Sequence, residues 1–158
     1  MSFRLAYPQG LHVPRVVKNP LAAAQTFNFG ALLLEDGSGN WAECGANPTS
    51  IGGVALSGAG SDTSGFNRFA RVEFPPNYME AMSVVNQIPF ACLYIGTLPA
   101  QAGATYGVTR DTDSNWKVDF TKNAANQRVT LLDITWTGAP ESQKYVVVAV
   151  LPANAQVV

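Results

Sequence analysis

The sequence predicts an all-β fold, a single small β-barrel or sandwich, from two observations. Short apolar runs alternate with clusters of Gly, Asn, Asp, Pro and Ser along most of the chain, and this punctuation is too frequent for helices and too regular for disorder. The same strand, turn, strand pattern also occurs twice, over residues 29–56 and again over 104–120. A chain of 158 residues is long enough to bury the core of one domain.

Residues 1–28 differ from the rest and predict an extended N-terminal arm. Pro8, Pro14 and Pro20 prevent a continuous helix and favour extended backbone before each of them. The arm is apolar and therefore needs a surface to lie on, either its own barrel or a neighbouring subunit. We expect the neighbour, so that a chain lacking residues 1–20 would still fold. The candidate contact residues of the arm are Phe3, Arg4, Leu5, Tyr7, Leu11, His12, Val13 and Arg15.

Residues 29–158 are expected to form the barrel domain. Its apolar runs, each bounded by turn residues, predict strands at 29–34, 41–44, 51–56, 87–95, 104–109, 116–120, 129–134 and 145–151. Pro89 has no N–H to donate, which places its strand at an edge or a bulge.

An insertion at about 57–87 interrupts these strands. Residues 57–65 have the composition of a flexible loop, whereas the following segment is rich in aromatic residues and methionine, with a short helix expected over 77–85 after two prolines. Such a segment either folds onto the barrel or forms an oligomer interface. The candidate interface residues are Phe66, Phe69, Arg71, Phe74, Tyr78, Met79 and Met82.

The composition bears on the class of partner. Only 13% of residues are charged and the formal net charge is −1, so there is no basic stripe for nucleic acid and little charge to oppose self-association. Burial in an assembly explains this, although a monomer coated with uncharged polar residues remains an alternative. No apolar run is long enough to span a bilayer, and residues 1–9 lack a signal-peptide core, so we expect synthesis in the cytoplasm.

No catalytic, metal or cofactor motif is complete in this sequence. His12 has no nucleophile to serve, and Asp111–Asn115 begins like a calcium loop but then has Trp116 and Lys122 in place of the turn glycine and the bidentate Glu. We read that segment as a polar hairpin turn. Cys44 and Cys92 belong to no metal motif and are expected to be buried small hydrophobes, a single disulfide being the alternative.

The run from Gly30 to Leu56 resembles the opening of tailed-bacteriophage capsid decoration (cement) proteins. Those small β-barrel proteins read glycine, apolar strand, turn, strand, then Ile-x-Gly-Val-Ala, and here Gly52 and Gly53 precede Val54-Ala55-Leu56 in that manner. Residues 103–108 and the last strand are similar to the family's closing strands. The long arm and the insertion depart from the family's pattern.

The resemblance implies a structural protein of the virion, on the outer surface of the capsid, with host cytoplasm as its location during assembly. Its implied partners are the major capsid protein and further copies of itself, a trimer rather than a dimer, with no nucleic acid, membrane, metal or cofactor. The alternative is a carbohydrate- or receptor-binding β-domain of a virion or cell-surface assembly, which would use Trp41, Trp116 and the hairpin tips. Catalysis ranks below both. Trp41, Trp116 and Trp136 could stack on a sugar ring, although packing at the end of the barrel is the favoured interpretation of these residues.

Overall fold

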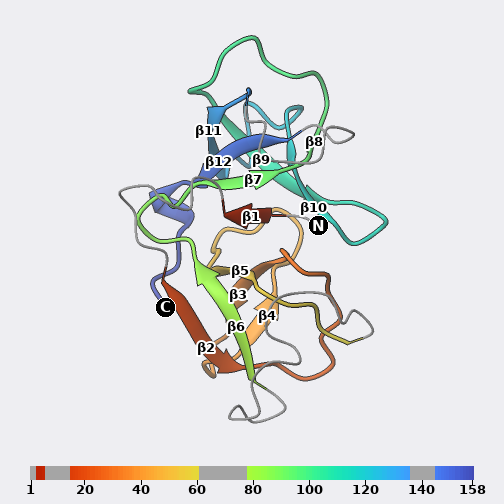
Figure 1. Cartoon of the computed structure of the whole chain (residues 1–158), viewed down its shortest axis with the longest axis vertical. Helices are drawn as coiled ribbons and strands as arrows, with labels where there is room; N and C mark the ends of the chain where they lie inside the picture. The colour runs from red at the N-terminus through yellow and green to blue at the C-terminus, as the bar shows by residue number, and fades with distance from the viewer. Residues whose placement is uncertain (1–2, 6–14, 61–77, 136–144) are drawn as a thin grey trace.

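The protein is an all-β sandwich of two sheets, seen one above the other in Figure 1. The computed structural model describes residues 3–5, 15–60, 78–135 and 145–158. The strands are β1 (Phe3–Leu5), β2 (Val16–Pro20), β3 (Leu32–Glu35), β4 (Trp41–Glu43), β5 (Gly53–Ala55), β6 (Tyr78–Ser83), β7 (Phe90–Cys92), β8 (Tyr94–Ile95), β9 (Thr105–Arg110), β10 (Trp116–Asp119), β11 (Val129–Asp133) and β12 (Val146–Val150).

Both sheets are open, so the fold is a sandwich and not a closed barrel. The larger sheet has the order β1-β7-β12-β11-β9-β10-β8, and the smaller has the order β2-β6-β5-β3-β4. All pairs are antiparallel except β8 with β10. The strands predicted at 29–34, 41–44, 51–56 and from 104 onward are confirmed, with shorter bounds in the structure.

The two hairpins that the sequence repeats, β3–β4 and β9–β10, have the same turn. Asp36 Oδ1 accepts hydrogen bonds from the N–H groups two and four positions further on, at 2.8 and 2.9 Å. Asp111 Oδ1 accepts the equivalent bonds, both at 2.9 Å. Gly39 and Ser114 occupy the same place in the two turns and have φ angles of 80° and 64°. The hairpin interpretation of Asp111–Asn115 is therefore confirmed.

This equivalence predicts how the turns respond to substitution. Gly39→Ser should lower the free energy of unfolding by about 1 kcal/mol, because a side chain makes left-handed backbone less favourable, whereas Ser114→Gly should not lower it. Gly37 is the matched control, since it has no atom within 4 Å of an added Cβ and no positive φ. Urea denaturation of the three variants checks the order, and equal losses in Gly37→Ser and Gly39→Ser would contradict it.

Two parts of the predicted arm belong to the chain's own sheets. β1 pairs with β7, and β2 pairs with β6. Phe3 is fully buried in the main core, where its ring meets that of Phe90 edge-on with centroids 6.4 Å apart. The Phe3 N–H donates to the carbonyl oxygen of Gly30 at 3.1 Å. The expectation that the arm lies on a neighbour is thus wrong for these two segments, because their apolar residues complete this chain's sandwich.

The smaller sheet curls until its two edge strands approach each other. Leu21, directly after β2, forms an isolated bridge with Trp41 of β4. The Trp41 indole, itself fully buried, donates from Nε1 to the carbonyl oxygen of Val17 at 3.4 Å. Asn19 Nδ2 donates to Glu35 Oε2 at 2.9 Å. These contacts occupy edges that would otherwise be open to pairing with another chain.

The C-terminal residues connect the two sheets. After β12 of the larger sheet, a 3-10 turn (η1, Pro152–Asn154) leads the chain to β3 and β5 of the smaller sheet. There the Gln156 side chain accepts from the N–H of Glu35 at 2.8 Å and donates to its carbonyl oxygen at 2.9 Å. A Cβ on Gly52 would lie 2.8 Å from Gln156 Oε1 and 3.0 Å from the Trp41 ring, so glycine leaves the space that both side chains need.

The helix predicted over residues 77–85 is wrong, because residues 78–83 form β6, a central strand of the smaller sheet. Its hydrogen bonds to β2 and β5 outweigh the local preference of the segment. The edge or bulge expected from Pro89 is wrong, because β7 lies between β1 and β12 and is paired regularly with both. Pro89 stands directly before β7, where no ladder hydrogen bond is needed from it. Within the described residues, no helix is long and apolar enough to cross a membrane.

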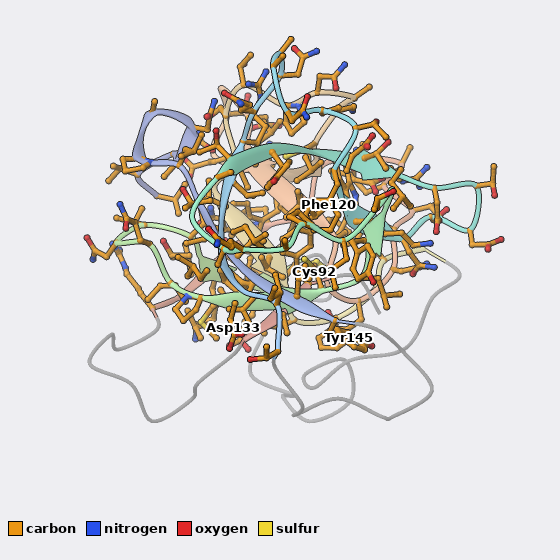
Figure 2. All side chains as sticks on the ribbon, turned by 90° about the horizontal axis from the view of Figure 1, so that it is seen from above. Cys92, Phe120, Asp133 and Tyr145 are labelled. Atoms are coloured by element: carbon orange, nitrogen blue, oxygen red, sulfur yellow. The ribbon has the colours of Figure 1, made fainter. Side chains whose placement is uncertain are left out.

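β7 and β12 are buried on both faces. Phe90, Cys92 and Val148 belong to the main core, whereas Ala91 and Val147, which point to the opposite side, are buried in a second small cluster with Tyr145. Figure 2 shows Cys92 inside the molecule and Tyr145 toward its rim. This burial explains why the last strand reads as an unbroken apolar run.

Candidate functional site

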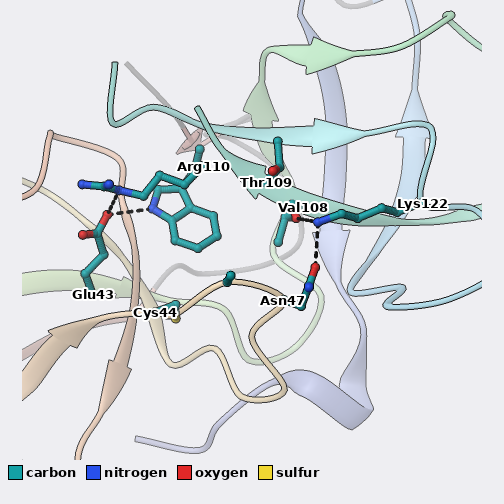
Figure 3. Close-up of a pocket in the computed structure, with 9 residues that line it drawn as sticks. Glu43, Cys44, Asn47, Val108, Thr109, Arg110 and Lys122 are labelled. Atoms are coloured by element: carbon teal, nitrogen blue, oxygen red, sulfur yellow. Dashed lines mark hydrogen bonds and ion pairs between the residues drawn. The ribbon is translucent and has the colours of Figure 1, made fainter. Parts of the chain in front are cut away.

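A polar hollow of about 360 Å³ opens between the two sheets, where β4 and the loop after it face β9 and β10 (Figure 3). The polar and charged residues that line it come from both sheets and are Glu43, Asn47, Thr109, Arg110, Trp116 and Lys122. It is the natural candidate site, because charged and polar groups converge there on a concave surface.

Glu43 joins the sheets at one end of the hollow. Its Oε1 atom accepts from Arg110 Nε at 2.7 Å and from Trp116 Nε1 at 3.0 Å. The Glu43 side chain is largely buried, whereas that of Arg110 is 37% exposed. The Glu43 N–H donates to Gln25 Oε1 at 2.9 Å, and this bond holds the end of β4 in place. The carboxylate therefore acts as a link between β4 and the β9–β10 hairpin.

Lys122 forms the second link, at the other end of the hollow in Figure 3. Its Nζ donates to Asn47 Oδ1 at 2.7 Å and to the carbonyl oxygen of Val108 at 2.8 Å. The stem of Lys122 lies across Gly107, where an added Cβ would come within 2.6 Å of Lys122 Cδ. Glycine at this position on β9 therefore lets the lysine reach the opposite sheet.

The loop carrying Asn47 is also fastened from the larger sheet by Arg128. Arg128 Nε donates to the carbonyl oxygen of Pro48, and its Nη2 donates to that of Asn47 at 3.4 Å. On the far side of the hairpin, Asn28 Nδ2 donates to the carbonyl oxygen of Asp113 at 3.0 Å. The walls of the hollow are thus set by bonds between the two sheets.

The cysteines near the core supply no reactive thiolate. Burial, with a smaller contribution from the charge of Glu43, raises the pKa of the Cys44 thiol to about 12. Burial raises the pKa of Cys92 further. Both are free and buried, which confirms their interpretation as small hydrophobes. Among the described residues, no group of three or more His, Cys, Asp or Glu side chains is placed to hold a metal.

The predicted arm residues are not brought together in the hollow. Phe3 is core, Arg4 and Leu5 pair through their backbones with Ala91 and Phe90, and Arg15 is exposed just before β2. Tyr7, Leu11, His12 and Val13 lie outside the described residues. The contact role proposed for Phe3 is wrong, because its side chain has no exposed surface.

The predicted insertion residues divide in the same way. Met79 is buried in the core and Met82 packs against it, so these two serve this chain's own fold, whereas Tyr78 is 41% exposed. Phe66, Phe69, Arg71 and Phe74 lie outside the described residues.

Trp41 and Trp116 have no open face for a sugar ring. Both are buried, and their indole N–H groups bind Val17 and Glu43 of this chain. Sugar stacking by these two residues is therefore excluded, and their interpretation as packing residues is confirmed. Of the groups named for the carbohydrate-binding alternative, the hairpin tips are left. Trp136 lies outside the described residues.

Sequence reasoning missed Glu43, Arg110 and Lys122. The partners of the ion pair are 67 positions apart, and nothing local says that the two hairpins face each other. The one available signal was the presence of charged residues beside strands in a chain that has few charges.

The β9–β10 turn carries a pH-dependent contribution to stability. Burial alone would raise the pKa of Asp111, but hydrogen bonds from Lys117 and from the N–H groups of Asn115 and Asp113 outweigh it and leave the pKa below its ordinary value of 3.8. A carboxyl with a lowered folded pKa contributes stability above the unfolded value, and this is lost as the pH falls through the folded value.

We therefore expect Asp111→Asn to lower the free energy of unfolding at neutral pH and to weaken its decline below about pH 4. Urea denaturation at a series of pH values measures this. Asp113→Asn removes the same charge from the same turn, but its side chain makes no hydrogen bond in the described part of the structure, so it should follow the parent. A parent-like pH dependence in Asp111→Asn would contradict the assignment.

The chain matches no protein-family model, no curated protein and no solved structure. Its function is therefore inferred from its own residues.

Proposed function

We propose that the protein is a structural decoration protein, which binds the outer surface of a tailed-phage capsid as a homo-oligomer and stabilises the shell by bridging neighbouring capsomers. The observation that carries the proposal is the low charge of the chain, 13% of residues with a net charge of −1, since so little charge leaves association with other subunits unopposed. The segment that resembles decoration proteins, Gly30 to Leu56, forms the consecutive antiparallel strands β3, β4 and β5.

The charged groups of the hollow also favour a structural role over catalysis. Glu43 and Arg110 bind each other, and Lys122 binds the Asn47 loop. In the described residues these groups join one sheet to the other and do not form a nucleophile with a base. A shell-stabilising protein needs this kind of internal rigidity, because a bridge between capsomers transmits load only if it does not deform.

Two exposed apolar side chains of the smaller sheet are available for contact with another subunit. Val16 on β2 is 45% exposed and Tyr78 on β6 is 41% exposed. Their strands are paired, but Val16 lies opposite Met82 and Tyr78 opposite Pro20, so the two side chains are at opposite ends of the pair. Aromatic side chains of this kind dominate binding energy at interfaces.

The test is cryo-electron microscopy of capsids assembled without this chain, mixed with the purified protein. We expect added density at regular positions on the outer shell. No density at saturating protein would overturn the proposal.

Tyr78→Ser then tests the oligomer by analytical ultracentrifugation. It should weaken association at least tenfold without moving the unfolding midpoint of the subunit. Leu132→Ser is the matched control, because Leu132 is 43% exposed on β11 of the other sheet. Equal effects of the two variants would remove the assignment of Tyr78 to the interface.

A further inference from the structure

Several donors lining the hollow are left without acceptors. Lys122 Nζ binds two neutral oxygens, those of Asn47 and Val108, and no carboxylate in the described part of the chain pairs with it. Arg110 binds Glu43 through Nε, and among the described residues neither of its Nη atoms has a partner.

The residues that line the hollow carry a net charge of about +1. Lys122 and Arg110 are cations and Glu43 is the one anion among the lining residues. A monoanion would balance this set, whereas a dianion such as phosphate would bring excess negative charge close to Glu43. The volume of about 360 Å³ lies at the small end of the range for ligand pockets, about 300 to 1,000 Å³.

The donors are also held in place before any ligand arrives. Gly107 and the two acceptors fix the Lys122 side chain, and Glu43 fixes the Arg110 guanidinium. A ligand therefore does not have to order long, flexible side chains on binding, which lowers the entropic cost of association. Both cations are thus held in place and, with respect to the residues that the structure describes, still have N–H groups free to donate. They can bind a carboxylate, which only accepts hydrogen bonds.

We propose that this hollow binds a carboxylate, with Lys122 Nζ as its principal hydrogen-bond donor and Arg110, at the other end of the hollow, as a second positive charge. The carboxylate comes either from a small molecule or from an Asp or Glu side chain of a protein partner. The site is separate from the exposed Tyr78 surface and does not depend on capsid binding.

Propionate, which reproduces the end of a glutamate side chain, is the first probe. In NMR titrations of the ¹⁵N-labelled protein at constant ionic strength, sodium propionate should shift the amide resonances of Asn47, Thr109 and Lys122 saturably, and sodium chloride should not. Absence of a saturable shift, or tighter binding of phosphate than of propionate, would overturn the proposal.

Variants connect the binding to the named atoms. Lys122→Met should weaken propionate binding at least tenfold, because it removes a charge-assisted hydrogen bond. Arg110→Gln removes the second positive charge and should weaken binding severalfold, so it tests the site even if Lys122→Met does not fold. Lys117→Met is the control, since Lys117 is paired with Asp111 at 2.6 Å and does not line the hollow. Unchanged affinity in both hollow variants would contradict the assignment.

Two capped tripeptides, Ala-Glu-Ala and Ala-Gln-Ala, identify the source of the carboxylate. Tighter binding of the Glu peptide than of propionate supports a protein side chain as the ligand. Binding of propionate with exclusion of both peptides supports a small molecule. Equal binding of the Glu and Gln peptides would show that charge is not recognised and would overturn the proposal.

Discussion

Phe3→Ala is expected to lower the free energy of unfolding by about 3 to 5 kcal/mol, the usual cost of truncating a buried phenylalanine. The Phe3 side chain is fully buried and meets Phe90 edge-on with centroids 6.4 Å apart. Its removal leaves a cavity where β1 joins β7, next to the bond between the Phe3 N–H and Gly30. Urea denaturation of the variant measures the loss.

Val16→Ala is the control for this prediction, because it truncates an apolar residue of the same predicted arm that is 45% exposed. It should change the free energy of unfolding by less than about 1 kcal/mol. Deletion of residues 1–20 removes both β1 and β2 and should abolish cooperative unfolding, contrary to the expectation from sequence. A folded, cooperative deletion variant would show that neither strand is needed for the sandwich.

Trp41→Ala is the second change with a large expected effect, about 3 to 5 kcal/mol of unfolding free energy. The indole is fully buried and fills the inside of the curled sheet, above the backbone of Gly52 and Gly53, where added Cβ atoms would lie 3.0 and 3.4 Å from the ring. Because neither glycine carries a side chain, neither can fill the cavity that the indole would leave. Denaturant and thermal melts both report the loss.

Trp41→Phe separates packing from the hydrogen bond to Val17. It retains an aromatic ring in the sheet and should cost clearly less than Trp41→Ala, because part of the cavity stays filled. Tyr78→Ala, which removes an exposed aromatic residue from the same sheet, is the control and should cost the least. A loss from Trp41→Ala no larger than that from Tyr78→Ala would contradict the role of Trp41 as the centre of this sheet.

The hairpins are the part of the fold that sequence predicted best. In both turns an aspartate binds N–H groups within its own four following residues, so the information is local. The buried cysteines were also predicted correctly, because each lies within an apolar strand-like run. Short-range patterns of this kind are independent of how the hairpins are later packed.

The helix expected over residues 77–85 shows where local information ends. Proline followed by polar and long side chains is compatible with a helix start, but the same residues form β6 because β2 and β5 provide partners on both sides. The prediction that the arm lies on a neighbouring subunit was wrong for the same reason, because β1 and β2 find partners in this chain. A strand of three residues such as β1 is defined by its partner and not by its own length.

The candidate site was beyond the reach of the sequence. Glu43 and Arg110 are 67 positions apart, and Lys122 and Asn47 are 75 apart. Each residue by itself is an ordinary charged or polar group near a turn. Their meeting depends on how one sheet is placed over the other, which no local pattern encodes.

The sequence by itself determined the all-β class, the two Asp-initiated hairpins and the burial of the cysteines, because these depend on alternation and on turn residues close together in the chain. Only the tertiary structure decided that the sheets stay open as a sandwich, that Phe3 belongs to the core, and that Glu43, Arg110 and Lys122 line one hollow. The physical reason is that these features are contacts between distant segments, whose free energy exists only once both sheets have formed.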